Sequence, residues 1–111
     1  DIPFDIKRIF YIYNADDKTV RGCHANRNSE FVLINVSGSS EVKINDGSHS
    51  VNIHLDKPMT GIYIPKMLWK EMYNFTTDAV LLCLTNTYYD SEEYIRDYEQ
   101  YLTEIKSNEQ I

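Results

Sequence analysis

Apolar and polar side chains alternate along most of this chain, and this period-two pattern constrains the fold more than any other feature. In the segment 40–45, Val42 and Ile44 point to one side while Lys43 points to the other. Comparable short segments follow one another up to about residue 87, with turn-forming residues between them. A series of this kind predicts an all-β antiparallel sandwich or barrel.

About eight strands are predicted, at 6–13, 19–26, 29–36, 40–45, 51–55, 61–64, 68–75 and 79–85. Asp46-Gly47 separates the fourth strand from the fifth. This dipeptide predicts a tight hairpin, because a type I′ turn needs a positive φ that glycine adopts readily.

The pattern changes near the C-terminus, where a helix is predicted over residues 90–106. Asp90 can cap this helix, with Glu93 completing a capping box. Its apolar stripe consists of Tyr94, Ile95, Tyr98, Tyr101, Leu102 and Ile105. The stripe packs either against the barrel or against a second subunit, and residues 107–111 are expected to fray.

The 111 residues are expected to form one domain, with a barrel at 1–89 followed by the helix. The formal net charge of −6 argues against a general nucleic-acid binder, whose affinity depends on many Lys and Arg contacts to phosphate. A small anionic ligand needs only one or two well-placed arginines. No signal peptide or membrane span is visible. Cys23 and Cys83 are expected to be buried, reduced thiols, which favours a cytoplasmic protein.

The most informative motif lies at Arg21–Asn28 and reads R-G-C-H-A-N-R-N. His24 and Asn26 are two residues apart on a predicted strand, so both side chains leave the same face. Together with Glu30 and Gly38, they have the spacing of a damaged metal-binding cupin signature.

The positions that would hold a metal are changed. Asn26 stands where the signature has a second histidine, and Trp69 stands where the last ligand is expected. An amide and an indole cannot replace the imidazole, thiolate or carboxylate ligands that these metals require. We therefore expect no metal, and we predict no other cofactor.

Four blocks of sequence, taken in order, resemble the WxcM-like cupins. The blocks are R-G-C-H-A-N, V-S-G-S-S-E-V-K-I-N-D-G, L-D-K-P-M-T-G-I-Y-I-P-K-M-L-W-K-E-M and Y-Y-D-S-E-E-Y-I-R-D-Y. The family comprises sugar 3,4-ketoisomerases acting on dTDP-4-keto-6-deoxyglucose. The resemblance implies a small antiparallel cupin (jelly-roll) barrel, usually a homodimer, that binds a dTDP-linked keto sugar at its mouth without a metal. Family members also carry an N-terminal strand segment that this chain is expected to lack.

The resemblance further implies catalytic roles for His24 and Asn26. In the family the motif is typically H-A-H, and both histidines are assigned to proton transfer. His24 matches the first and is expected to be the acid–base at carbon, since the pKa of imidazole is roughly 6.5. Asn26 replaces the second; it cannot carry a proton but can donate a hydrogen bond to an enediolate oxygen. Water, Tyr13 or Tyr63 would then carry the proton between the two oxygens.

Six residues are predicted to bind the substrate: Arg21, Glu30, Tyr13, Tyr63, Trp69 and Lys70. Arg21 either meets the diphosphate or pairs with Glu30. Trp69 either stacks on the thymine or packs in the core, and Lys70 either reaches the barrel mouth or stays exposed. On the helix, Arg96 is predicted to form a surface or interface ion pair with Asp97.

Three functions fit this sequence. The leading prediction is a ketoisomerase that converts a dTDP-4-keto-6-deoxyhexose to its 3-keto isomer, in the synthesis of deoxyamino sugars and surface polysaccharides. The alternatives are a non-catalytic sugar-nucleotide-binding domain, in which Asn26 marks lost chemistry, and a related dTDP-sugar epimerase.

Overall fold

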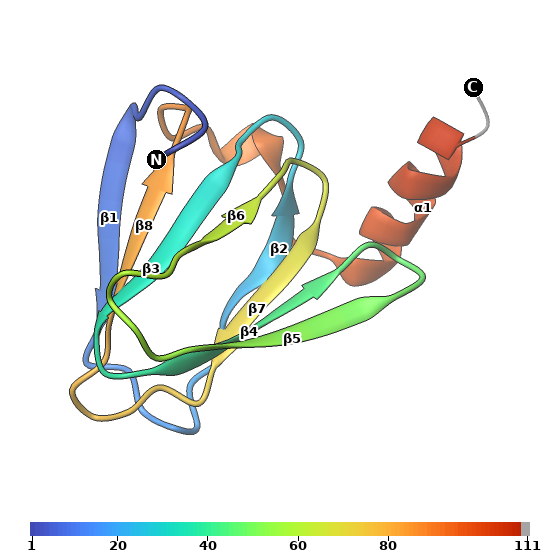
Figure 1. The fold of residues 1–111 in the computed structure, drawn as a ribbon. Coiled ribbons are helices and arrows are strands. Elements are labelled where there is room, and N and C mark those ends of the chain that lie inside the picture. Colours follow the sequence, from blue (N-terminus) through green and yellow to red (C-terminus); the bar gives the residue numbers. More distant parts are fainter. Residues whose placement is uncertain (110–111) are drawn as a thin grey trace.

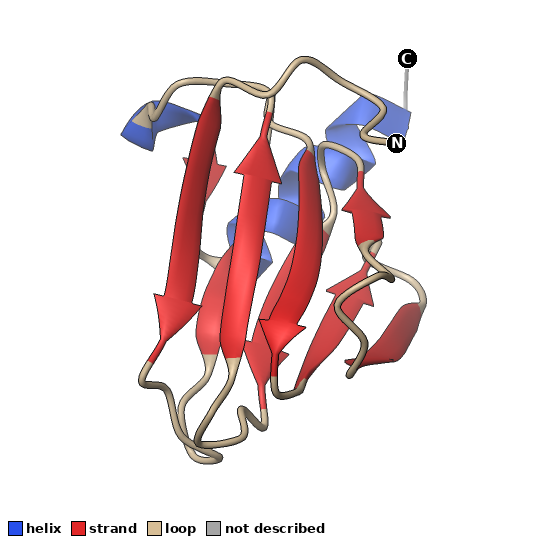
Figure 2. Cartoon of the chain, turned by 60° about the vertical axis from the view of Figure 1, so that its left-hand side comes forward, coloured by secondary structure: helices blue, strands red, loops and turns tan. Residues whose placement is uncertain are grey.

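Two antiparallel sheets face each other in the computed structural model, which describes residues 1–109 (Figures 1 and 2). One sheet has four strands in the order β1-β8-β3-β6, and the other has five in the order β5-β4-β7-β2-β9. The one α-helix among the described residues lies outside this pair of sheets, against the five-stranded one (Figure 1). The predicted all-β antiparallel fold with a C-terminal helix is confirmed.

The predicted strands are all present, with ends that differ from the prediction by at most two residues. The elements are β1 Arg8–Tyr13, β2 Arg21–Asn26, β3 Phe31–Ser37, β4 Ser40–Asn45, β5 Ser50–Leu55, β6 Ile62–Ile64, β7 Trp69–Tyr73, β8 Val80–Thr85, the 3₁₀ turn η1 Ser91–Glu93, β9 Tyr94–Ile95 and α1 Tyr98–Glu109.

The C-terminal segment differs from the prediction of one helix over 90–106. Asp90 caps only η1, where its side chain accepts a hydrogen bond from Glu92 N at 3.0 Å. The next two residues form β9, in which Ile95 pairs with Ala25 of β2. The α-helix starts later and is capped by Asp97, which accepts from Glu99 N at 2.9 Å. It continues past the predicted end at 106, and the last two residues of the expected frayed tail lie outside the described part of the chain.

The main core lies between the two sheets and is built from inward-pointing apolar side chains. Its fully buried members include Leu33, Val42, Ile64 and Leu81. Each such side chain contributes about 1.5–3 kcal/mol of transfer free energy to folding. A second, smaller core lies between α1 and the outer face of the five-stranded sheet, around Tyr101. The part of the predicted stripe that lies in α1 therefore packs against the barrel, whereas Tyr94 and Ile95 belong to β9.

Two local predictions need correction. The hairpin at Asp46-Gly47 is present, with Gly47 at φ 98°, but the turn spans residues 46–49 rather than two residues. Asp46 explains the longer turn, because its carboxylate accepts hydrogen bonds from the backbone N–H groups of Ser48 and His49. Both cysteines are free, and Cys83 is buried as expected, but Cys23 is exposed.

Candidate active site

A β-bulge in β2 orients the residues of the R-G-C-H motif. Arg21 pairs with Met72 and His24 pairs with Lys70, but the register shifts between Gly22 and His24. The intervening Cys23 has φ 55°, and Gly22 has φ 84°. A Cβ at Gly22 would lie 3.0 Å from the Lys70 carbonyl oxygen, so glycine is needed here for space as well as for φ. The bulge allows Arg21 and His24, three positions apart, to face the same cavity.

This cavity has a volume of about 470 Å³ and lies between the two sheets. The strands β1, β2, β3, β7 and β8 contribute residues to it, and the segment between β8 and α1 lines one side. The lining residues are Arg8–Ile12, Arg21, Gly22, His24, Phe31, Leu33, Lys70, Met72, Cys83, Tyr89, Tyr94 and Arg96.

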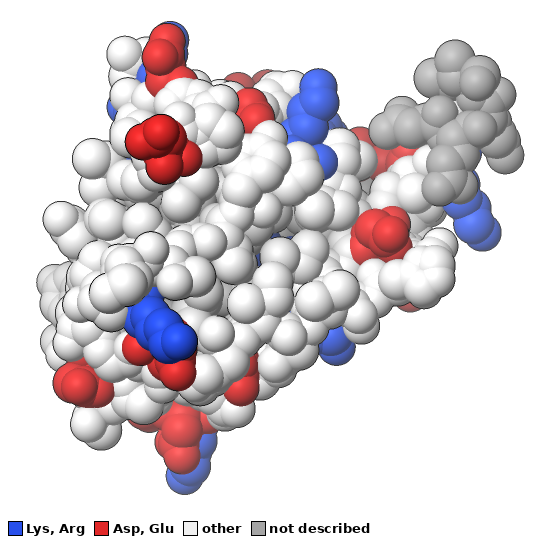
Figure 3. Space-filling model, viewed as in Figure 1, with Lys and Arg blue, Asp and Glu red and all other residues white. Residues whose placement is uncertain are grey.

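The cavity is strongly basic, although the protein as a whole is acidic. Arg8, Arg21, Arg96 and Lys70 line it, and no Asp or Glu is among the described lining residues. The formal net charge of the chain is −6. On the face that Figure 3 shows, acidic and basic side chains are interspersed over a mostly uncharged surface. Positive charge concentrated in a cleft indicates an anionic ligand.

Arginine and aromatic side chains form one wall of the cavity. The Arg8 guanidinium lies 5.4 Å from the Tyr89 ring centre, and the Arg96 guanidinium lies 4.5 Å from the Tyr94 ring centre. Arg8 also donates a hydrogen bond to the Tyr94 hydroxyl at 3.2 Å. Its Nε is buried without a hydrogen-bond partner among the described residues.

His24 has the protonation state of a base. Its Nδ1 lies 3.0 Å from the Gly22 carbonyl oxygen, which can only accept, so Nδ1 carries the proton and Nε2 has the free lone pair. Burial, together with the nearby positive charge of Lys70, lowers the pKa of His24 to about 4. The imidazole is therefore neutral near pH 7 and able to accept a proton.

Lys70 is the most unusual residue of the site. Its side chain points into the barrel from the position opposite His24, and the residue is only 3% exposed. Its Nζ donates to Asn26 Oδ1 at 2.8 Å and lies 4.5 Å from the centre of the Phe31 ring. Burial lowers the pKa of Lys70 to about 7, although the negative charge of Glu93 partly opposes this. Of the two alternatives for Lys70, the exposed position is wrong.

Asn26 lies behind Lys70 and does not line the cavity. Its Nδ2 donates to the Glu93 carboxylate, which also accepts hydrogen bonds from Asn28 N, Ser29 N and Ser29 Oγ. Burial raises the pKa of Glu93, but these hydrogen bonds outweigh it and the net shift is downward. The Asn26 amide is thus fixed between an anion and a cation, and its position does not suit the predicted hydrogen bond to an enediolate oxygen.

The other predicted binding residues lie outside the cavity. Trp69 points away from the cavity and packs on Tyr98 and Tyr101 of α1. Of the two predicted alternatives for Trp69, the structure therefore has packing in the core. Tyr13 is 62% exposed.

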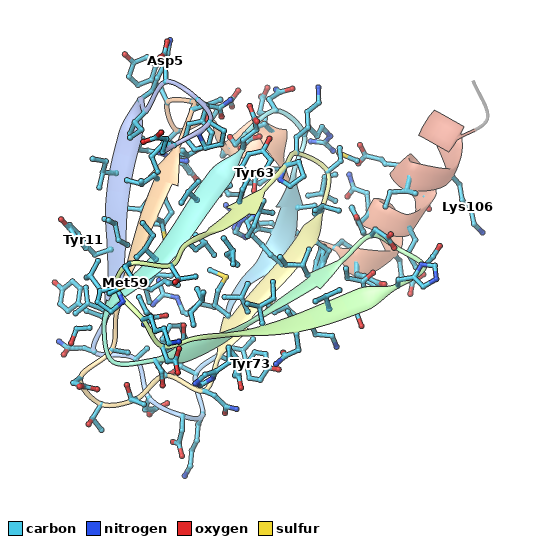
Figure 4. All side chains as sticks on the ribbon, in the orientation of Figure 1. Asp5, Tyr11, Met59, Tyr63, Tyr73 and Lys106 are labelled. Atoms are coloured by element: carbon cyan, nitrogen blue, oxygen red, sulfur yellow. The ribbon has the colours of Figure 1, made fainter. Side chains whose placement is uncertain are left out.

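Tyr63 lies on the outer strand β6 of the four-stranded sheet (Figure 4). Its hydroxyl donates a hydrogen bond to the Glu30 carboxylate. Tyr63 lines a separate cavity of about 380 Å³. The alternative pairing of Arg21 with Glu30 is not observed among the described residues.

Several residues of the cavity were not predicted, including Arg8, Tyr89 and Tyr94. Arg96 was expected to pair with Asp97, but Arg96 lines the cavity while Asp97 caps α1. The available signal was the block Y-Y-D-S-E-E-Y-I-R, whose aromatic residues and arginine belong to the cavity wall rather than to a helix.

Among residues 1–109, no group of three or more His, Cys, Asp or Glu side chains could hold a metal ion. The expectation of a metal-free protein stays a prediction. None of the helices described is long and apolar enough to cross a membrane.

Fold and site together define a class: a small antiparallel β-barrel with a basic cavity that contains a neutral histidine and a buried lysine. A family model described as "FdtA: WxcM-like, C-terminal" matches residues 1–106. The chain belongs to this family.

Its relatives include named ketoisomerases. The TDP-4-oxo-6-deoxy-alpha-D-glucose-3,4-oxoisomerase of Aneurinibacillus thermoaerophilus is 40% identical over 91% of this chain and 73% of its own length. The structure of WlaRA, a TDP-fucose-3,4-ketoisomerase from Campylobacter jejuni, is 55% identical with a TM-score of 0.88, covering 90% of this chain and 74% of that chain. QdtA, a sugar 3,4-ketoisomerase from Thermoanaerobacterium thermosaccharolyticum solved in complex with TDP, is 40% identical with a TM-score of 0.93, covering 96% and 78%.

Proposed function

We propose that this protein is a TDP-sugar 3,4-ketoisomerase that converts a TDP-4-oxo-6-deoxyhexose to its 3-keto isomer. The observation that carries the proposal is the 40–55% identity to ketoisomerases, over most of the length of each, in a chain whose cavity holds a neutral histidine among basic residues. The arginines Arg8, Arg21 and Arg96 would bind the diphosphate. We further propose that the protein acts as a homodimer in the cytoplasm, in the synthesis of deoxyamino sugars for surface polysaccharides; the two free cysteines support the location.

His24 supports the first chemical step. A base must remove the proton from C3, after which the electrons of the C3–H bond form a C3=C4 double bond and negative charge develops on the C4 oxygen. The free Nε2 of His24 would take this proton, and the imidazolium would later deliver a proton to C4. The basic lining of the cavity stabilises the enolate oxygen.

Proton NMR of TDP-4-oxo-6-deoxyglucose in deuterium oxide tests the proposal. Wild type should exchange the C3 proton and form the 3-keto product. His24→Asn should lose both while still binding TDP, because the basic residues Arg8, Arg21 and Arg96 that line the cavity are unchanged. Wild type that binds TDP but catalyses no exchange would refute the isomerase and favour the non-catalytic domain.

The same spectra also test the alternative that the protein is a dTDP-sugar epimerase. An epimerase would exchange the proton and return the carbonyl to C4, so that a 4-keto epimer accumulates instead of a 3-keto sugar. The identity to named ketoisomerases favours transposition of the carbonyl.

A further inference from the structure

We propose that Lys70 is the second acid–base group of the reaction: it donates a proton to the C4 oxygen and accepts one from the C3 hydroxyl. This inference rests on the proposed function, because it assigns the step that His24 leaves unexplained. The step requires a group that can both release and bind a proton, and the amide of Asn26 can do neither.

Position is the first argument. His24 and Lys70 are paired residues on the neighbouring strands β2 and β7. Side chains directly opposite each other on such a pair have Cβ atoms about 4.5–5.5 Å apart and share one face. Both residues line the same cavity, so a sugar ring held there can meet both groups at adjacent carbons.

The surroundings of Lys70 are the second argument. The residue is 3% exposed, and Asn26 Oδ1 accepts from its Nζ at 2.8 Å. A buried lysine in a structural role would be expected to pair with a carboxylate. Here the carboxylate of Glu93 is held one residue away, on the far side of Asn26, and the lysine meets a neutral amide. This arrangement holds the Lys70 amine in place without a direct ion pair that would keep it permanently protonated.

The groups facing Lys70 keep it able to titrate near neutral pH. They are His24 and Arg21 from β2, Arg8 from β1, Cys83 from β8, and Glu93 through Asn26. Burial raises the pKa of the Cys83 thiol to about 12, so this group is neutral. Because burial lowers the pKa of Lys70 to about 7, ammonium and free amine are both populated at the pH where the enzyme would work.

The proton balance closes with these two residues. His24 takes the C3 proton while the Lys70 ammonium gives a proton to the C4 oxygen, which yields a neutral enediol. The Lys70 amine then takes the proton of the C3 hydroxyl, the C3–O bond becomes a carbonyl, and the imidazolium delivers its proton to C4. Both residues return to their starting states, and no oxidant or reductant is needed.

Two substitutions separate proton transfer from charge. Lys70→Arg keeps a cation that cannot release its proton near neutral pH. It should retain exchange of the C3 proton, because the charge still stabilises the enolate, while formation of the 3-keto product falls by about 10²–10⁴-fold. Lys70→Ala opens space for an added amine. Ethylamine should restore product formation, whereas tetramethylammonium, a cation without a transferable proton, should not. Lys43→Ala, at an exposed position of β4, is the matched control and should behave as wild type.

The outcomes distinguish this inference from the proposed function. Product formation by Lys70→Arg at the wild-type rate would overturn the inference, and so would equal rescue of Lys70→Ala by both cations, because Lys70 would then supply only charge. The rescue does not depend on whether an arginine fits the cavity. If wild type itself neither exchanges nor isomerises the substrate, the proposed function fails first.

Discussion

Lys70→Met should make the protein more stable at low pH, and the gain should shrink as the pH rises. The pKa of Lys70 is lowered from 10.5 to about 7 in the folded state. Between these values the unfolded chain binds more protons than the folded chain, so the wild-type free energy of unfolding increases with pH. The penalty for burying the lysine is complete below pH ~7 and disappears above pH ~10.5. Methionine has a similar length and carries no charge, so the variant avoids this penalty throughout.

The size of the effect follows from the shift in pKa. Each pKa unit corresponds to about 1.4 kcal/mol, which gives a penalty of about 5 kcal/mol at pH 6 and about 2 kcal/mol at pH 9. The variant also leaves Asn26 Oδ1 without its partner, which costs about 1–3 kcal/mol at every pH. The lost hydrogen bond changes the difference in the free energy of unfolding between the two proteins by the same amount at every pH. It therefore does not alter how that difference varies with pH. We therefore expect the difference in the free energy of unfolding to fall by about 3 kcal/mol between pH 6 and pH 9.

Urea unfolding followed by circular dichroism, at pH steps between 6 and 9, measures this difference. Lys43→Met provides the control, since Lys43 is exposed on β4 and its replacement should give a difference that stays flat with pH. A flat difference for Lys70→Met as well would refute the reasoning, because it would mean that Lys70 is charged in the folded protein at the same pH as in the unfolded one.

Arg21→Met should weaken TDP binding by about 1.5–3 kcal/mol in calorimetry, since a charged hydrogen bond to phosphate is lost; unchanged affinity would remove Arg21 from the site. Glu93→Gln should lower the free energy of unfolding by about 1–3 kcal/mol in urea, because one carboxylate serves several buried donors; an unchanged midpoint would contradict this. Elemental analysis of purified protein should find no stoichiometric zinc, iron or manganese, and finding one would disprove the metal-free prediction. Light scattering should give the mass of two chains, whereas a single chain at micromolar concentration would exclude the homodimer.

Alternation alone was enough to predict the strands, because each sheet has one face against the core and a polar residue on the opposite face is stable in water. The C-terminal segment could not be predicted in the same way. Tyr94 and Ile95 have a spacing that suits a helix, yet they form a strand because β2 offers an unpaired edge to them. Asp90 and Asp97 both carry a capping signal, and only the packing shows that the second one begins the helix.

The residues of the candidate site that lie in a sequence motif could be predicted. Those whose position depends on the register between two strands could not. His24 and Arg21 were identified from R-G-C-H-A-N, and both line the cavity. Lys70 was expected to be either at the mouth or exposed, since a lysine next to a tryptophan has no sequence signal for burial. Its position in the cavity follows from the pairing of β2 with β7, which places Lys70 opposite His24 although the two residues are 46 positions apart in the sequence (70 − 24 = 46).

Strand β7 presents neighbouring residues to two different parts of the molecule. The indole of Trp69 packs beneath α1, whereas the ammonium of Lys70 enters the cavity. Deleting or inserting one residue in this strand would exchange the two, with a cation under the helix and an indole among the arginines. Among related chains, variation in length should therefore accumulate in turns such as 46–49 and be absent from 69–72.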